Sequence, residues 1–154
     1  MITTNIITSP IINGTPSGSG LPTLIFLKGD ASGDYATSST SFVKVANSLS
    51  RSLTVPTGWK LRITATGNVY VSTAAVQIVF AIFDGGTSLQ EMVIIPPSAA
   101  ASSDCFHLDY VIEGDGGTHY ISLMFRTTNA ADAANIRNSS SQIPTMILEM
   151  TPSN

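Results

Sequence analysis

The stretch Trp59-Lys60-Leu61-Arg62-Ile63-Thr64-Ala65-Thr66-Gly67-Asn68-Val69-Tyr70-Val71-Ser72 decides the fold class of this chain. Its odd positions are apolar apart from Gly67, and its even positions are charged, amide-bearing or hydroxyl-bearing. Successive side chains of a strand point to opposite faces, so this alternation predicts one long strand with one face in a core and the other in water. Such a strand is typical of an all-β, antiparallel β-sandwich.

Short apolar runs separated by turn residues continue on both sides of this stretch, at the spacing of a sandwich. We expect strands near 22–28, 40–46, 50–55, 58–72, 75–84, 88–95, 105–113, 118–127 and 143–151. Two Asp-Gly-Gly sequences, at 84–86 and 115–117, predict tight hairpins because glycine supplies the positive φ that such turns require. Pro96 and Pro97 cannot continue a ladder and predict a loop between sheets. The Ala-rich residues 130–134 favour a loop over a single helical turn.

The N-terminus differs in character from the rest of the chain. Residues 14–20 contain only Gly, Thr, Pro and Ser, which is typical of a flexible joint. The segment before the joint carries five isoleucines, Ile2, Ile6, Ile7, Ile11 and Ile12. It is either a disordered tail or a docking arm that adds a strand to a neighbouring subunit or capsid. We therefore divide the chain into an arm and joint, 1–20, and a single β-sandwich domain, 21–154.

Composition limits the function classes. Only 11% of the 154 residues are charged and the formal net charge is -3, so no basic patch is present for nucleic acid or an anionic membrane surface. The apolar run 76–83 is too short to span a bilayer as a helix. Residues 1–12 have neither the basic region nor the apolar region of a signal peptide. Cys105 is the single cysteine, which excludes an intrachain disulfide.

Two predicted strands carry more apolar residues than one core face uses. In 76–83 both parities are apolar, which places Val79 and Phe83 on the outer face. In 119–126 the residues Ile121, Leu123 and Phe125 would face inward, and Tyr120 and Met124 outward. Apolar area left in water costs about 25 cal/mol per Å², so we expect these side chains to be covered. A homo-oligomer interface formed by Val79, Phe83, Tyr120 and Met124 is our preferred interpretation; a covering arm or loop of the same chain is the alternative.

Candidate chemistry is sparse. Cys105 and His107 share a strand face without a motif for nucleophilic catalysis, so a half-buried structural thiol is the simpler interpretation. His107, Asp109 and His119 would approach a zinc-binding arrangement if the strands joined by the Asp115 turn pair with each other; otherwise both histidines are solvated. The 29–34 loop offers oxygen ligands for calcium but lacks a complete calcium-loop pattern, so an ordinary polar turn is the alternative.

Aromatic side chains are the remaining candidates for ligand binding. Strand parity buries Trp59 and Tyr110, which leaves Tyr35, Tyr70 and Tyr120 as surfaces for stacking on a cell-surface glycan. No pair of carboxylates with glycosidase character and no phosphate-binding glycine loop is recognisable. The sequence therefore predicts a chain that is not an enzyme, with no catalytic, cofactor-binding or metal-binding residues to assign.

The segment Leu53-Thr54-Val55-Pro56-Thr57-Gly58-Trp59-Lys60-Leu61-Arg62-Ile63 resembles the strand-Pro-x-Gly-aromatic-strand signature of trimeric jelly rolls of the tumour necrosis factor and complement-head type. It is also similar to head domains and capsid-decorating proteins of tailed bacteriophages. The resemblance implies a non-enzymatic virion protein, a homotrimer that docks onto a capsid or tail and stabilises it.

A receptor-binding or carbohydrate-binding head of a phage tail fibre is the alternative that this resemblance implies. In both cases the protein would be located in the virion and made in the host cytoplasm without a signal peptide. The family's folds are binding and assembly modules, so the resemblance carries no catalytic residues.

Overall fold

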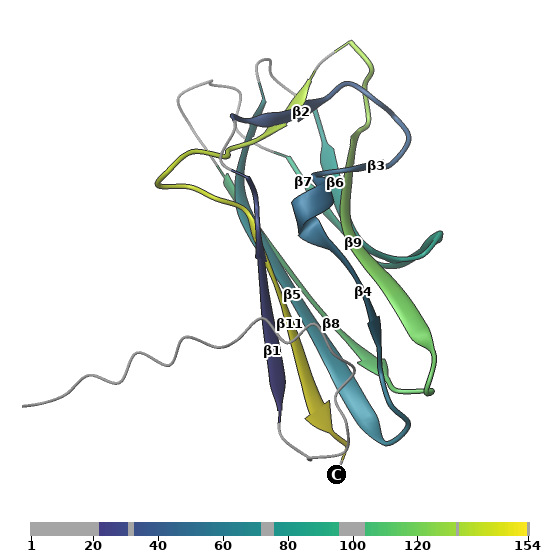
Figure 1. Cartoon of the computed structure of the whole chain (residues 1–154). Coiled ribbons are helices and arrows are strands. Elements are labelled where there is room, and N and C mark those ends of the chain that lie inside the picture. Colours follow the sequence, from purple (N-terminus) through teal and green to yellow (C-terminus); the bar gives the residue numbers. More distant parts are fainter. Residues whose placement is uncertain (1–21, 31–32, 72–75, 96–103, 132, 154) are drawn as a thin grey trace, which may run out of the picture.

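The chain folds into two antiparallel sheets packed face to face (Figure 1). A computed structural model describes residues 22–30, 33–71, 76–95, 104–131 and 133–153. This architecture confirms the all-β sandwich predicted from the alternation of 59–71, and it is consistent with the jelly-roll type. The five arm isoleucines and the joint that follows them lie outside the described residues.

Eleven strands and one short 3-10 helix make up the described fold. They are β1 (Thr23–Lys28), β2 (Tyr35–Thr37), β3 (Val43–Lys44), η1 (Asn47–Leu49), β4 (Ser50–Thr54), β5 (Trp59–Val71), β6 (Ile78–Asp84), β7 (Thr87–Ile94), β8 (Asp104–Glu113), β9 (Thr118–Thr127), β10 (Ala134–Ile136) and β11 (Thr145–Pro152).

β5 is the centre of the six-stranded sheet. β8 pairs with one side of β5, while β11 and β10 share the other side end to end. β1 lies outside β11 and β2 lies outside β10, both antiparallel. The long predicted strand therefore organises one complete layer of the sandwich.

The five-stranded sheet is built around β9 and β6. β6 lies between β9 and β7, and β3 and β4 share the other side of β9. The predicted hairpin at 84–86 is confirmed, because β6 and β7 pair across it down to Asp84 and Thr87 and Gly85 has a φ of 59°. A register shift beside Ile82 and Phe83 interrupts this ladder.

The predicted hairpin at 115–117 is wrong in its pairing. β8 pairs with β5 and β9 pairs with β6, β3 and β4, so this turn crosses from one sheet to the other. Gly116 has the expected positive φ, 84°. The backbone of this turn forms hydrogen bonds with Val55: the Gly116 N–H donates to the Val55 carbonyl, and the Val55 N–H donates to the Gly117 carbonyl. The residues around Pro96 and Pro97 are outside the described part, but β7 and β8 on either side do belong to different sheets, as predicted.

Short strands were the least predictable elements. The strand expected at 40–46 is reduced to Val43–Lys44, whereas Tyr35–Thr37 and Ala134–Ile136 form a ladder that was expected to be loop. β10 exists because it pairs with β5 on one side and β2 on the other. A three-residue strand has too little alternation to be recognised without those partners.

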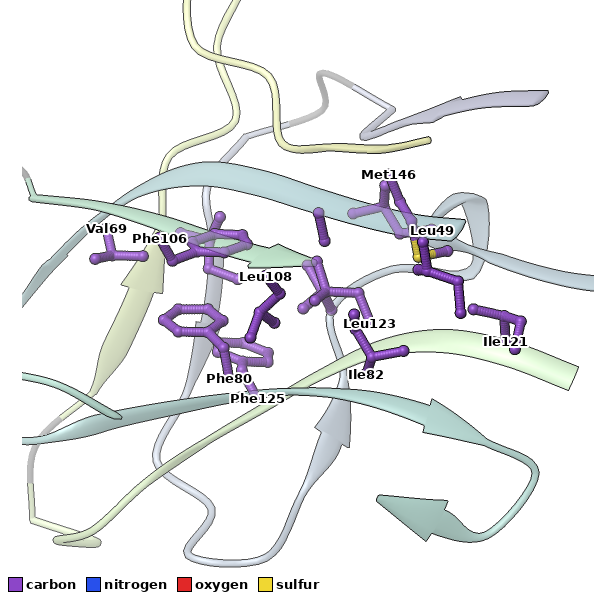
Figure 2. Packing of buried hydrophobic residues seen from close by; sticks show 14 of the residues in the cluster. Leu49, Val69, Phe80, Ile82, Phe106, Leu108, Ile121, Leu123, Phe125 and Met146 are labelled. Atoms are coloured by element: carbon purple, nitrogen blue, oxygen red, sulfur yellow. The ribbon is translucent and has the colours of Figure 1, made fainter. Parts of the chain in front are cut away.

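The core lies between the sheets and is built from strand faces of one parity (Figure 2). Leu61, Ile63 and Ala65 of β5 are fully buried, as their parity predicts. The rings of Phe80 (β6) and Phe106 (β8) stack across the sheets with centroids 4.2 Å apart. Trp59 and Tyr110, which we expected to be buried, are partly buried and pack against this core.

Candidate functional site

The outer face of the five-stranded sheet is the surface on which an interface was predicted. On β9 the inward residues Ile121, Leu123 and Phe125 are buried as expected, so Tyr120 and Met124 point away from the core. The next strand places Phe83 opposite Ser122 and Ala81 opposite Met124 on the same outer face. The predicted residues therefore belong to one surface.

These residues differ in how much surface they still expose. Val79 is only 2% exposed in the single chain, while Phe83 and Met124 are partly buried and Tyr120 is 43% exposed. Part of the cover comes from Phe42, just before β3, whose ring lies 5.1 Å from that of Phe83. The chain thus covers some of its own outer apolar face, and the role of these residues in an interface stays a prediction.

Lys44 gives the exposed end of this surface a specific polar contact. Its Nζ donates a hydrogen bond of 3.2 Å to the Tyr120 hydroxyl and lies 5.3 Å from the ring centroid. This hydrogen bond and the charge of Lys44, with a further bond from Ser50, lower the pKa of Tyr120 from its ordinary value. At the other end, Arg126 lies 5.0 Å from the ring of Phe42. Two cations therefore border the aromatic side chains.

The outer face of the six-stranded sheet has a polar half and an apolar half. Across β5 and β8, Arg62 forms a bidentate ion pair with Asp109, which lowers the pKa of that carboxyl, and Lys60 pairs with Glu113 at 3.4 Å. At the opposite edge, β1 turns Leu24 and Phe26 into solvent. The charged half and the apolar half thus lie on opposite sides of β11.

Exposed apolar side chains occur on both sheets. Among the described residues, the large apolar side chains with more than two fifths of their surface exposed are Leu24 (51%), Phe26 (66%), Val93 (55%), Ile95 (64%), Val111 (46%) and Tyr120 (43%). Tyr120 alone was singled out from the sequence. A strand of a sandwich needs apolar residues on one parity only, the one that faces the core. The continuous apolar run from Leu24 to Leu27 has them on both parities, and could therefore have predicted the exposed apolar surface of β1.

The zinc-binding arrangement of His107, Asp109 and His119, which required the strands on either side of the Asp115 turn to pair, does not form. The alternative of two solvated histidines is wrong for His119, whose side chain is only 11% exposed. β8 and β9 lie in different sheets, and Asp109 is held by Arg62 on the outer face of the six-stranded sheet. Within the described residues no group of three His, Cys, Asp or Glu side chains suits a metal ion. The convergence depended on a hairpin pairing that the chain does not form.

His119 is instead a nearly buried connector between turns. Its Nδ1 lies 2.7 Å from Asp84 Oδ2 and its Nε2 lies 3.3 Å from Asp115 Oδ1. Asp84 also accepts the Tyr120 N–H at 2.7 Å. A hydrogen bond from the Gly117 N–H, and a further one from His119, lower the pKa of Asp115. This cluster ties the two Asp-Gly-Gly turns together at one end of the five-stranded sheet.

Cys105 and His107 line an open groove on the six-stranded sheet. Cys105 is a free, exposed thiol, which corrects the expectation of half-burial. The groove encloses about 360 Å³. Its lining residues are Thr66, Gly67, Asn68, Cys105, Phe106, His107, Ser141, Gln142 and Ile143. The groove is therefore lined by amide, hydroxyl and imidazole groups together with apolar side chains.

The side chains of the 29–34 loop are used to hold the loop in place. Asp34 accepts the Asn138 N–H at 2.9 Å and the Tyr70 hydroxyl at 2.8 Å, and Asp30 accepts the Tyr35 hydroxyl at 2.6 Å. Asn138 donates its side-chain N–H to the Gly33 carbonyl at 3.0 Å. The described part of the loop therefore acts as a polar turn that anchors the segment after β10.

These contacts leave less tyrosine surface available for stacking on a sugar. The hydroxyls of Tyr35 and Tyr70 are engaged by Asp30 and Asp34, and the guanidinium of Arg137 lies 4.5 Å from the Tyr70 ring centroid. One face of Tyr70 is thus occupied, whereas Tyr120 keeps a substantial exposed surface.

Comparisons with known proteins give a structural likeness without a sequence relative. A protein of the infectious bursal disease virus Gt strain superimposes with a TM-score of 0.53 at 12% identity, over 94% of this chain and 42% of that chain. The fold is similar to that of a virus protein. The VP2 subviral particle of the same virus gives a TM-score of 0.48 at 12% identity, over 86% and 37% of the two chains. Its derived T=1 particles give 0.49 at 11% identity, over 95% and 39%.

The chain spans less than half the length of these structures. At 12% identity, the likeness to the Gt strain structure shows the sandwich fold alone. No protein-family model matches the sequence, and no curated protein matches it. Among the described residues, none of the helical segments has the length and apolar character needed to cross a membrane.

Proposed function

We propose that this chain is a non-enzymatic structural protein of a virus particle, which assembles as a homotrimer and docks onto a capsid or tail through its N-terminal arm. The observation that carries the proposal is the apolar outer face of the five-stranded sheet, where Tyr120 is 43% exposed and Met124 and Phe83 are partly exposed. Apolar patches of this kind are typical of interaction surfaces. An assembly partner removes them from water.

The outer face around Tyr120 and Met124 is the proposed subunit contact. It combines a mobile thioether, an exposed aromatic ring and the partly buried Phe83, which are residue types enriched in the centres of interfaces. Lys44 at its border donates to the Tyr120 hydroxyl, so the polar end of that ring remains satisfied when its apolar body is covered. A closed cyclic oligomer uses the same patch on each subunit.

The comparisons support the virion context. The Gt strain structure that this fold resembles comes from a virus, and the likeness covers 94% of this chain. The trimer comes from the resemblance of 53–63 to trimeric jelly rolls of the tumour necrosis factor and complement-head type, and the phage assignment from its likeness to phage head and capsid-decorating proteins. Capsid decoration is the specific task that we propose.

Light scattering coupled to size exclusion tests the assembly. We expect the full chain to elute at three times its mass of 16.1 kDa, and a variant lacking residues 1–20 to remain an oligomer because Tyr120 and Met124 belong to the sandwich domain. A monodisperse monomer at micromolar concentration in both cases contradicts the proposal. Circular dichroism on both samples checks that the sandwich is intact.

A carbohydrate-binding head of a tail fibre is the second candidate, and the groove beside Cys105 favours it. Asn68, Ser141 and Gln142 present amides and hydroxyls of the kind that bind sugar hydroxyls. A glycan array with the oligomer tests this function, using Gln142→Ala as the matched variant. Binding lost in Gln142→Ala supports a glycan site in the groove, and an array without any binding argues against this candidate.

A further inference from the structure

β1 is an edge strand with apolar surface on both faces. It pairs with β11 from Thr23↔Met150 to Lys28↔Thr145, and no other described strand lies along its second side. Leu24 and Phe26 point outward and are 51% and 66% exposed. The backbone edge and both side chains together form a surface that a further strand would cover.

The inner face of β1 is also incompletely covered. Ile25 and Leu27 pack against the core but stay partly exposed, whereas Met146 and Leu148 of the neighbouring β11 are fully buried. The core is therefore open at the β1 edge. A strand added there would bury apolar area on both of its faces.

The other long edge strands carry features that prevent pairing, and β1 does not. β8 turns His107, Asp109 and Glu113 outward, and the β6–β7 ladder contains a register shift next to the exposed Glu91 of β7. Charges and bulges are the usual protection of sheet edges. In β1 the single charge is Lys28 at its last position. This edge is thus open to β-strand addition.

We infer that residues 2–12 of a neighbouring copy add as a strand to the free edge of β1. The inference rests on the proposed assembly, and it names the edge of β1 as the surface on which the N-terminal arm docks. The segment carries isoleucine on both parities, Ile2, Ile6 and Ile12 on one and Ile7 and Ile11 on the other. A strand beside β1 needs apolar side chains on both parities, because one parity would lie next to Ile25 and Leu27 and the other next to Leu24 and Phe26.

The charge and the length of the N-terminal segment fit a strand beside β1. Residues 1–21 contain no charged side chain, so no side-chain charge would have to be desolvated when they are buried against β1. Residues 2–9, which precede Pro10, are long enough at about 3.3 Å per residue to follow the six residues of β1. Residues 13–21 can reach up to about 30 Å when extended, which allows the arm to leave its own sandwich. Because every copy gives one arm and offers one edge, the exchange closes into a ring.

Directed cross-linking tests the exchange. In a Cys105→Ser background, one preparation carries Ile6→Cys, and a second preparation with a size tag carries Leu24→Cys. After mixing and mild oxidation we expect a disulfide that joins a tagged to an untagged chain. The matched control places the second cysteine at Val93→Cys, an exposed position on the other sheet, and should give no such product.

Hydrogen exchange of the full chain gives an independent readout. Removal of residues 1–12 should make the backbone amides of β1 exchange about tenfold faster or more, with β7 unchanged. Unchanged exchange of β1 overturns the inference, as does the absence of a disulfide between the Ile6→Cys and Leu24→Cys chains. An oligomer that persists without any arm cross-link refutes the arm exchange alone, whereas a monomeric full chain refutes the proposed assembly itself.

Discussion

Gly114 lies where the turn after β8 meets the turn before β5. Its N–H donates to the Trp59 carbonyl at 2.7 Å. A Cβ at this position would collide with the carbonyl oxygen of Pro56 and lie 2.9 Å from the Trp59 oxygen. Both neighbours are backbone atoms, which cannot rotate away as a side chain does. This position therefore requires glycine because there is no space for a Cβ atom. A positive φ is not the reason, since Gly114 does not have one.

We expect Gly114→Ala to lower the free energy of unfolding by about 1–3 kcal/mol, the usual cost of forcing an extra group into a packed site. Urea denaturation followed by circular dichroism measures this. The matched control is Gly86→Ala, because a Cβ there meets nothing within 4 Å. Equal midpoints for the two variants would contradict the steric explanation.

Asp34 is the residue through which pH acts on the segment after β10. The Asn138 N–H is the main cause that lowers the pKa of Asp34 below its ordinary value of 3.8, and the Tyr70 hydroxyl and the charge of Arg137 act in the same direction. A carboxyl with a lowered folded-state pKa stabilises the fold above its unfolded pKa, and the contribution disappears as pH falls through the folded value.

The free energy of unfolding should therefore decrease between about pH 5 and pH 2, and Asp34→Asn should make this decrease smaller. Asp109 and Asp115 also have lowered pKa values, so part of the decrease remains. Tyr70→Phe removes one of the two hydrogen bonds but keeps the ring next to Arg137, and should give an intermediate slope. Urea midpoints measured across this pH range test the order of the three proteins. An identical slope for all three would contradict it.

At the scale of elements, the sandwich is held together by contacts between the faces of β6 and β8. Phe80 and Phe106 stack with 10° between their planes, and Phe125 of β9 lies 6.3 Å from Phe80. Gly67 of β5 makes room for this stack, because a Cβ there would lie 2.6 Å from the Phe106 ring. The one interruption in the alternation of β5 is thus explained by packing.

Phe106→Ala should lower the free energy of unfolding by about 3–5 kcal/mol, since it removes a fully buried ring and leaves a cavity. Val93→Ala, at an exposed position of β7, should change it by less than about 0.5 kcal/mol. Denaturant titration of both variants checks the difference. A small effect of Phe106→Ala would mean that the two sheets repack closely around the missing ring.

At the scale of the whole molecule, the two outer faces are expected to differ in function. The face with Tyr120 is the proposed subunit contact, while the polar half of the other face carries the Arg62–Asp109 and Lys60–Glu113 ion pairs. A charge introduced on the first face would have to be desolvated in an interface. On the second face it would stay in water.

Tyr120→Glu should therefore reduce the solution mass from that of a trimer towards 16.1 kDa, with an unchanged circular dichroism spectrum. The exposed position and the nearby Lys44 allow the folded monomer to accept the carboxylate. Val111→Glu on the other face should leave the trimer intact. A trimer in both variants, measured by light scattering, would place the subunit contact elsewhere.

The sequence by itself determined the strands that are long and alternate. β5, β8 and β9 were predicted to within a few residues, because ten or more residues give enough repeats of the two-residue period to identify a buried face. β6 is apolar on both parities and was recognised as a continuous apolar run instead. The outward positions of Tyr120 and Met124 follow from the same parity, as does the shared face of Cys105 and His107. The turn residues at 84–86 and 115–117 were also correct as turns.

Only the tertiary structure decided which strands are neighbours. An Asp-Gly-Gly turn has the same local chemistry whether the chain returns to the same sheet, as after Asp84, or crosses to the other, as after Asp115. That choice separated His119 from His107 and placed it between Asp84 and Asp115. The order of the strands in the six-stranded sheet also leaves β1 at an edge, with Phe26 exposed. Strand pairing depends on residues distant in the chain, and local periodicity identifies a buried face but contains no information about which strands are neighbours.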